Sequence, residues 1–224
     1  MSQSNGAEEV REVRKSIVLL AVFVVAAAAI SVAVSGRTAT AKARTTKVTI
    51  LHNLWWELVG QFQNSAPGVT PVTHFHYGYL SWVQGVSAFD APSRTVKTAD
   101  FTFYANGKTS PPITNGPLYF ITRTGTLTIY RDLSHNSNFK KRNTFKDGTP
   151  VLVATYRHQP IASSLTNAIS LFSHDQITFT RPFETAHGMV QLGTVGETFD
   201  EHYVGQGNMP GPPSGYFIGY ATNG

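Results

Sequence analysis

The chain has 224 residues, 41% of them hydrophobic and 14% charged, which excludes a mainly disordered protein and suits one or two folded domains. It has no cysteine, which excludes disulfides, thiolate nucleophiles and cysteine-based zinc sites. The net charge of +5 is concentrated in residues 37–47, which carry +4, whereas residues 48–224 carry +1. Because a nucleic-acid-binding domain needs its positive charge on the fold itself, we expect no nucleic-acid partner.

Residues 17–34 form a run of 18 residues without a charged side chain. A soluble helix would need a polar face, so this run predicts an N-terminal hydrophobic helix at the membrane. The small residues Ala33 and Ser35 allow cleavage of a signal peptide, and residues 1–35 are therefore either a cleaved signal peptide or an uncleaved signal anchor. The large domain behind this segment favours export, so we expect a protein that is secreted or membrane-anchored, with its domain outside the cytoplasm.

Residues 36–47 are small, polar and basic, and they predict a linker, so that residues 48–224 form a single domain. The first apolar stretch of this domain has two interpretations. Apolar residues in the range 51–58 fall at helical spacing and predict a short amphipathic helix over residues 48–60. A first strand at residues 48–51 is the alternative.

From residue 73 onward the apolar pattern alternates with a period of two, which predicts strands. His74, His76 and Gly78 share one face of the first of them, and Phe75, Tyr77 and Tyr79 share the other. We expect further strands at 100–104, 118–123, 126–131, 151–157, 169–172, 176–181, 194–203 and 216–221.

Turn-forming residues separate these strands. Asn106-Gly107 and Asp147-Gly148 predict turns, Gly125 predicts a bulge or tight turn, and Ser173-His174-Asp175 predicts a connection. Residues 205–215 are too rich in glycine and proline for a regular element. Consecutive short strands without crossover helices predict an all-β fold, most simply a single antiparallel β-barrel of about eight strands, with a sandwich as the alternative.

Three segments carry a resemblance to a known family: GPLYFITRTGTLTIYRD (116–132), FKDGTPVLVAT (145–155) and GPPSGYFIGYA (211–221). Over about residues 70–222, the order of the strands, the placement of the turns and the threonine- and aromatic-rich composition resemble the allene-oxide-cyclase-like β-barrels. That group is similar to the dirigent proteins. The resemblance implies an eight-stranded barrel with an apolar cavity. It also implies cyclase or isomerase activity in some members, and it assigns no catalytic residue here.

Aromatic strand residues are the candidate ligand-binding residues. A barrel can hold an apolar molecule between aromatic rings while tyrosine hydroxyls orient it, although small barrels also fill their interiors with side chains. The candidates are Tyr77, Tyr79, Phe101, Phe103, Tyr119, Tyr130 and Tyr156.

Metal binding and catalysis have weaker signals. His74 and His76 point the same way, as cupin ligands do, but no acidic residue follows before Asp90, and the later histidines lack ligand spacing. We therefore predict neither a metal site nor a cofactor.

Glu197, Asp200 and Glu201 are candidates for acid–base catalysis, and the alternative is that they are surface charges. The sequence GPPSG at 211–215 does not suit the nucleophile elbow of a serine hydrolase. The basic residues of the loop at 140–146 predict a solvated loop, and contact with an anionic surface or ligand is the alternative.

The leading hypothesis is an exported or membrane-tethered barrel that binds a small apolar molecule, in contact with the membrane through residues 17–34 if that segment is uncleaved. One alternative is a cyclase or isomerase that works without a cofactor by enclosing a flexible apolar substrate. Another is a cell-surface interaction module with a filled barrel. The sequence leaves open whether the protein is an enzyme and whether it forms a homo-oligomer.

Overall fold

The computed structural model describes residues 47–66, 70–207 and 214–223. The expected hydrophobic helix at 17–34, the segment 1–35 that contains it and nearly all of the linker lie outside the described residues. In the part of the chain that is described, no helix combines the length and apolar character needed to cross a membrane. Residues Thr45–Gly224 form a compact unit of their own, so the barrel can be studied as this fragment.

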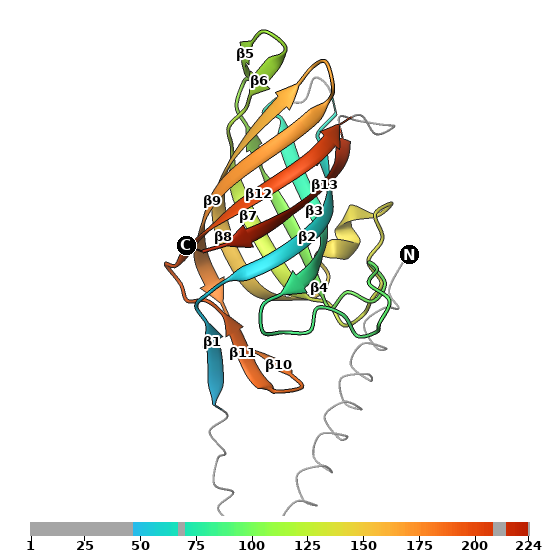
Figure 1. Ribbon diagram of the computed structural model, residues 1–224, viewed down its shortest axis with the longest axis vertical. Coiled ribbons are helices and arrows are strands. Elements are labelled where there is room, and N and C mark those ends of the chain that lie inside the picture. The colour runs from blue at the N-terminus through green and yellow to red at the C-terminus, as the bar shows by residue number, and fades with distance from the viewer. Residues whose placement is uncertain (1–46, 67–69, 208–213, 224) are drawn as a thin grey trace, which may run out of the picture. The chain divides into compact units, whose positions relative to one another are not determined.

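Eight long antiparallel strands form a closed barrel, as the sequence predicts (Figure 1). The strands follow one another around the barrel in the order β8-β7-β4-β3-β2-β13-β12-β9, and pairing of β9 with β8 closes the circle. Their bounds are β2 (Trp55–Asn64), β3 (Thr73–Val83), β4 (Phe101–Thr109), β7 (Arg123–Arg131), β8 (Thr149–Ser163), β9 (Ala168–Thr180), β12 (Thr198–Gly207) and β13 (Ser214–Thr222).

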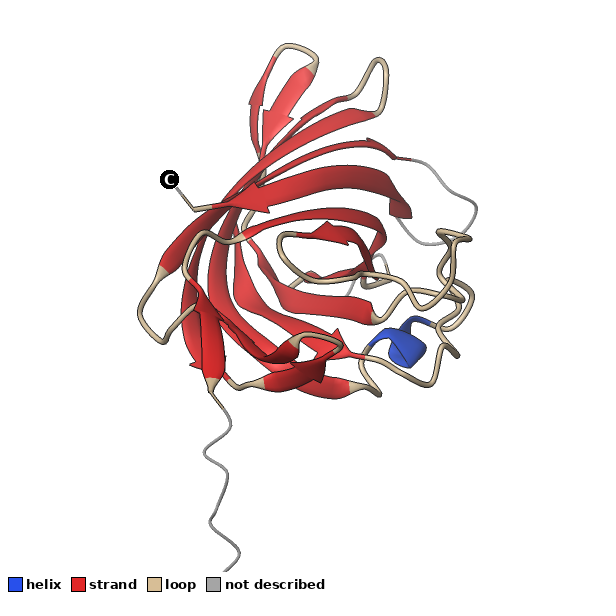
Figure 2. Cartoon of the chain, turned by 60° about the horizontal axis from the view of Figure 1, so that its bottom comes forward, coloured by secondary structure: helices blue, strands red, loops and turns tan. Residues whose placement is uncertain are grey.

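Shorter elements extend the barrel. A three-stranded sheet combines β1 (Val48–Leu51), β11 (Gly188–Leu192) and β10 (Phe183–Thr185), with β1 parallel to β11. Phe183 of this sheet packs edge-on against Phe101 of the barrel, with ring centroids 5.3 Å apart. A hairpin of β5 (Ile113–Asn115) and β6 (Leu118–Phe120) pairs with the end of β8. The single 3-10 turn among the described residues, η1 (Arg142–Phe145), lies beside the barrel wall with its flanking loops (Figure 2).

The start of the domain is a strand, and the prediction of a helix over residues 48–60 is wrong. Residues 48–51 are β1, and β2 follows directly from residue 55. In β2 the buried and exposed residues alternate, with Trp56 and Leu58 inside the barrel and Trp55 outside. The helical spacing of apolar residues there spans two strands, because Leu51 ends β1, Leu54 lies between the strands, and Trp55 and Leu58 lie on opposite faces of β2.

Three predicted interruptions lie inside continuous strands. Asn106-Gly107 belongs to β4, Gly125 belongs to β7, and Ser173-His174-Asp175 belongs to β9. Gly107 and Gly125 pair with each other across the β4–β7 ladder. Both positions serve close packing rather than a turn, because a Cβ atom on either one would overlap the opposite backbone and the Tyr156 hydroxyl.

This packing gives a stability prediction. We expect Gly125→Ala to cost about 3 kcal/mol, because the added methyl group overlaps backbone atoms that cannot move without opening the ladder. Thr126→Ala, on the outward face of the same strand, should cost less than about 1 kcal/mol. Urea unfolding of the two variants measures the difference, and equal midpoints would show that Gly125 is not needed for the close approach.

Candidate functional site

Polar and ionisable side chains gather inside one half of the barrel, and we call them the interior polar cluster. They face inward from six strands and, except for Asn64, are almost fully buried. The cluster consists of Asn64, His74, His76, Arg123, Tyr156, His158, Ser173, Asp175, Glu201 and Tyr203. Because burying polar groups costs free energy unless they are paired, a cluster of this size inside a small barrel marks a candidate functional site.

The basic side of the cluster is a short chain of hydrogen bonds. His74 Nδ1 lies within hydrogen-bonding distance of Asn64 Oδ1, and Arg123 Nη1 donates to His74 Nε2 over 3.2 Å. Since an amide oxygen only accepts, Nδ1 carries the proton and His74 is neutral. Burial, reinforced by the nearby Arg123 charge, holds the pKa of His74 well below its usual value. Burial also lowers the pKa of Arg123 to about 10.

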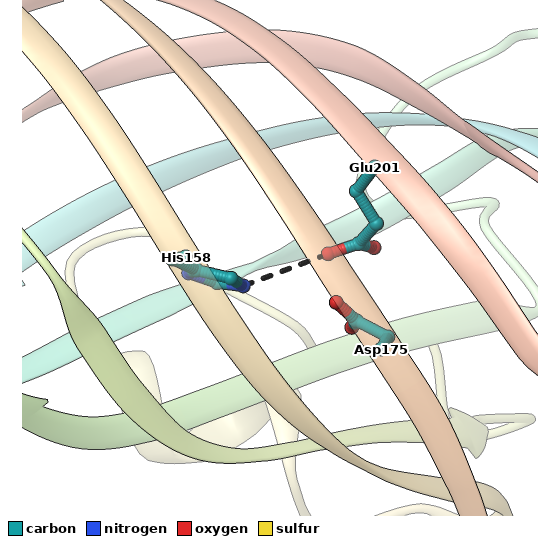
Figure 3. Close-up of side chains that lie close together, drawn as sticks. All are labelled: His158, Asp175 and Glu201. Carbon is teal, nitrogen blue, oxygen red and sulfur yellow. Dashed lines mark ion pairs between the residues drawn. The ribbon is translucent and has the colours of Figure 1, made fainter.

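The acidic side brings three residues together from neighbouring strands: His158 of β8, Asp175 of β9 and Glu201 of β12 (Figure 3). Strand register explains the meeting, because His158 and Glu201 both pair with Ser173 of the strand between them. His158 Nε2 lies 3.7 Å from Glu201 Oε2, which is too long for a hydrogen bond.

The pKa values on the acidic side favour the uncharged forms. Burial, and then the nearby Glu201 carboxylate, raise the pKa of Asp175 well above its usual value. Burial lowers the pKa of His158, and burial together with Glu201 raises the pKa of Tyr203. The surroundings therefore resist separate charges on these groups unless a further cation or proton balances them.

Several buried polar atoms of the cluster have no hydrogen-bond partner. These atoms are His76 Nδ1, Arg123 Nε, Tyr156 OH, both ring nitrogens of His158, Asp175 Oδ2 and Glu201 Oε1. Unpaired buried groups are rare in folded proteins, so these atoms point to a bound water, proton or ion.

The space beside the cluster is small. A cavity lined by His76, Arg123 and Tyr203 together with apolar neighbours has a volume of about 10 Å³. That is room for about one water molecule or one ion and not for an organic substrate. The rest of the barrel interior is occupied by apolar side chains, of which Trp56, Phe101, Phe103 and Phe199 are the largest.

The candidate ligand-binding residues do not form one site. Phe101, Phe103 and Tyr156 point inward into the packed interior. Tyr77, Tyr79 and Tyr130 lie on the outer wall, and Tyr119 lies on β6 beside the barrel.

The basic loop covers part of this outer wall. Its Phe145 is fully buried against Tyr77, with ring centroids 5.5 Å apart. Arg142 lies 4.1 Å above the ring of Phe75 and donates to Gln63, while Lys146 lies 5.1 Å above Tyr104. Lys140, Lys141 and Lys146 are exposed, as expected for a solvated loop, but Arg142 and Lys146 also lie over aromatic rings of β3 and β4.

The adjoining part of the wall, beyond this loop, is uncovered by the described residues, and we call it the outer apolar face. It spans the outward surfaces of β3, β2, β13, β12 and β9 and consists of Trp55, Trp82, Phe172, Val204, Tyr216, Ile218 and Tyr220. Cross-strand pairing orders these residues in rows. His202 stacks on Phe172 with centroids 4.7 Å apart and meets Tyr220 edge-on, and Val204 pairs with Ile218 in the next row.

Two adjoining grooves run over the outer apolar face. The first has a volume of about 560 Å³ and is lined mainly by apolar residues, with Glu57, Ser81 and His202 as its polar contributors. The second, of about 580 Å³, shares Val59, Val204 and Ile218 with the first. Ile218, 59% exposed, lines both grooves.

The three acidic candidates separate in the structure. Glu197 lies in the turn before β12 and bonds to His52 at 2.6 Å, and Asp200 faces solvent and bonds to His174 at 2.8 Å. Only Glu201 enters the interior polar cluster. Its partners His158 and Asp175 were missed, although the alternation of Leu171, Ser173, Asp175 and Ile177 is a strand signal that could have found Asp175.

No protein-family model, curated protein or solved structure matches this chain. The closed antiparallel barrel implied by the resemblance to the allene-oxide-cyclase-like proteins is present, while membership of that family stays a prediction.

Proposed function

We propose that this protein is a binding barrel that holds a small apolar molecule in the grooves of its outer apolar face. The observation that carries the proposal is the run of exposed apolar side chains across five neighbouring strands. Soluble monomers rarely expose a contiguous apolar surface of this kind unless it binds something.

The contrast between the two surfaces of the barrel supports this location. The interior is packed, with a cavity of about 10 Å³ beside its polar cluster, whereas each outer groove offers more than fifty times that volume. Volumes of about 300 to 1,000 Å³ are typical of sites for small molecules. The outward residues of β7 and β8 are mainly polar, so the apolar surface is confined to one side.

The polar groups at the groove suggest what kind of molecule fits. Glu57, Ser81 and His202 stand among apolar residues, and Glu57 brings an acceptor with negative charge. An apolar molecule that carries a hydroxyl or amino group suits this lining better than a fatty acid, because a carboxylate would face Glu57.

Two further parts of the proposal come from the sequence. Residues 17–34 would export the barrel or tether it to a membrane, which would bring it near apolar molecules. The eight-stranded antiparallel barrel is also consistent with kinship to the allene-oxide-cyclase-like proteins. A cyclase that encloses its substrate is the less favoured alternative, because it needs more interior space than the cavity beside the polar cluster provides.

Binding can be tested with N-phenyl-1-naphthylamine, a neutral fluorescent probe, added to residues 45–224. We expect saturable binding that quenches Trp55 and Trp82 and is competed by long-chain or terpenoid alcohols. Ile218→Asp should weaken binding by about tenfold or more, because it places a charge between the two grooves. Thr155→Asp adds the same charge on the polar outer side, at β8, and is the matched control.

The outcomes are distinct. Absence of probe binding, or binding that Ile218→Asp and Thr155→Asp leave equally intact, would contradict the proposal. Sedimentation velocity distinguishes a further case. If the wild-type fragment is a stable dimer that Ile218→Asp converts to monomers, and the probe does not bind either form, the face is covered by a second copy and the proposal is wrong.

A further inference from the structure

His158, Asp175 and Glu201 are placed as a set of metal ligands. One ligand atom from each residue lies within 4.8 Å of the other two, and the side chains converge from three consecutive strands (Figure 3). Around a tetrahedral ion bound at about 2.0 to 2.2 Å, ligand atoms lie about 3.3 to 3.6 Å apart, which is closer than the 4.8 Å limit of this set. His158 Nε2 lies 3.7 Å from Glu201 Oε2, and the other oxygen of this carboxylate, Oε1, has no hydrogen-bond partner.

The unpartnered atoms of these residues include one ligand atom from each residue for a metal ion. Asp175 Oδ2, Glu201 Oε1 and both ring nitrogens of His158 are buried without a hydrogen-bond partner. Asp175, Glu201 and His158 are each at most 2% exposed. Water cannot reach these groups freely, so their bonding capacity is left for an occupant inside the barrel.

Neighbouring groups hold the ligands in place. The Ser173 hydroxyl donates to Asp175 Oδ1, and the Tyr203 hydroxyl donates to Glu201 Oε2, so each carboxylate keeps one oxygen bound and one free. The His158 ring is stacked between Tyr156 and His76, with centroids 3.7 and 5.1 Å away. Such supporting contacts are a regular feature of metal centres, where they fix the orientation of each ligand.

From this geometry we propose that the barrel interior binds one divalent transition-metal ion through His158, Asp175 and Glu201. Two carboxylates and an imidazole suit Zn²⁺ or Mn²⁺, whereas Ca²⁺ takes six to eight oxygen ligands. A charge of +2 balances two carboxylates in a site where separate charges are costly. The site is independent of the outer apolar face, since Glu201 points inward and its neighbour His202 points outward.

The test uses residues 45–224, cleared of metal with a chelator and then titrated with ZnCl₂ and with MnCl₂ by calorimetry. We expect one ion per chain with at least one of the two metals. Glu201→Gln and Asp175→Asn keep the side-chain size and should each weaken binding by about 100-fold or more. Ser173→Ala, which removes only a supporting hydroxyl, should weaken it by about 10-fold to 100-fold.

The chain offers a matched control in His174 and Asp200. These two residues lie next to Asp175 and Glu201 on the same strands, face outward and bond to each other at 2.8 Å. His174→Gln and Asp200→Asn should leave metal binding unchanged. Substitution with Co²⁺ adds a spectroscopic readout, because its visible bands should change with His158→Gln and stay the same with His174→Gln.

The proposal is overturned if neither metal binds, or if the inward and outward variants weaken binding equally. It is also overturned if Asp175→Asn and Glu201→Gln raise the stability of the fragment while metal content stays near zero. That result would mean that the two carboxyl groups share a proton and serve no ion.

Discussion

The metal-free barrel is expected to lose stability when the pH falls from 6.5 to 5, because acid protonates the unfolded chain more than the folded one. His74, His76 and His158 have pKa values lowered by burial, so in the folded state they resist protonation. In the unfolded chain they take up protons below a pH of about 6.5. The unfolded state therefore binds more protons in this window, and acid favours it.

Asp175 acts in the opposite direction. Its raised pKa means that the folded state keeps a proton that the unfolded state has lost, which stabilises the fold as the pH falls below that raised value. Three histidines outnumber this one carboxyl group, so acid destabilises the fold on balance. Each proton bound only by the unfolded state corresponds to about 1.4 kcal/mol per pH unit.

Urea unfolding at pH 6.5 and pH 5 measures this loss. His74→Gln should reduce the slope by about 1.4 kcal/mol per pH unit, because glutamine can still bond to Asn64 and Arg123 but does not titrate. His174→Gln, which removes an exposed histidine outside the barrel interior, is the matched control for the substitution itself. Equal stability at the two pH values would show that the buried histidines are not held neutral.

Trp56→Ala is expected to cost about 3 to 5 kcal/mol, the largest loss from a single side chain. Trp56 is 1% exposed and packs edge-on against Phe199 with ring centroids 4.9 Å apart, in the apolar half of the interior. Removing the indole leaves a cavity that the closed ladder cannot easily collapse to fill. Since small domains have about 5 to 15 kcal/mol of stability in total, this variant should unfold at a much lower urea concentration.

The neighbouring residue is the control. Trp55 lies one position earlier, points outward and is 51% exposed, with Trp82 as its aromatic partner. Trp55→Ala should cost less than about 1 kcal/mol but should weaken probe binding, because it lines the first groove. A comparable loss of stability in the two variants would mean that the inward and outward faces of β2 are assigned wrongly.

The barrel itself was predictable because period-two alternation is a local signal that strands display directly. It identified β3 with the correct faces, with His74 and His76 on the inner side. Local patterns could not predict the full length of those strands whose inward-facing residues include glycine or polar side chains. Gly107 and Gly125 suggest turns, and only their pairing across β4 and β7 explains why both must lack a side chain.

The candidate site was hardest to predict for the same reason. Ser173, His174 and Asp175 have the composition of a turn, and in β9 two of them point into the barrel. His158 lies one residue beyond the predicted end of its strand at 157, so its inward direction was not considered. Its meeting with Asp175 and Glu201 depends on the register of three strands that are far apart in sequence, which one sequence does not reveal.

The aromatic residues show a related limit. Alternation separates the two faces of a strand but does not say which face of a barrel wall holds the ligand. Tyr77 and Tyr130 point outward from the barrel wall, outside the outer apolar face, and pack with Phe139 and Phe145 of the loop that covers this part of the wall. The exposed residues of β13, Tyr216, Ile218 and Tyr220, were not candidates, although they alternate with the inward glycines and Phe217.

Methyl-group NMR of the fragment 45–224 tests most directly whether an apolar molecule binds outside a packed barrel. Val59, Val204 and Ile218 line the outer grooves, whereas Leu127, Ile129 and Leu152 belong to the buried interior core and line neither groove. On titration with N-phenyl-1-naphthylamine, we expect the methyl signals of the first three to shift and those of the last three to stay in place. Shifts concentrated on Leu127 and Ile129 would place the molecule inside the barrel and contradict binding at the outer apolar face.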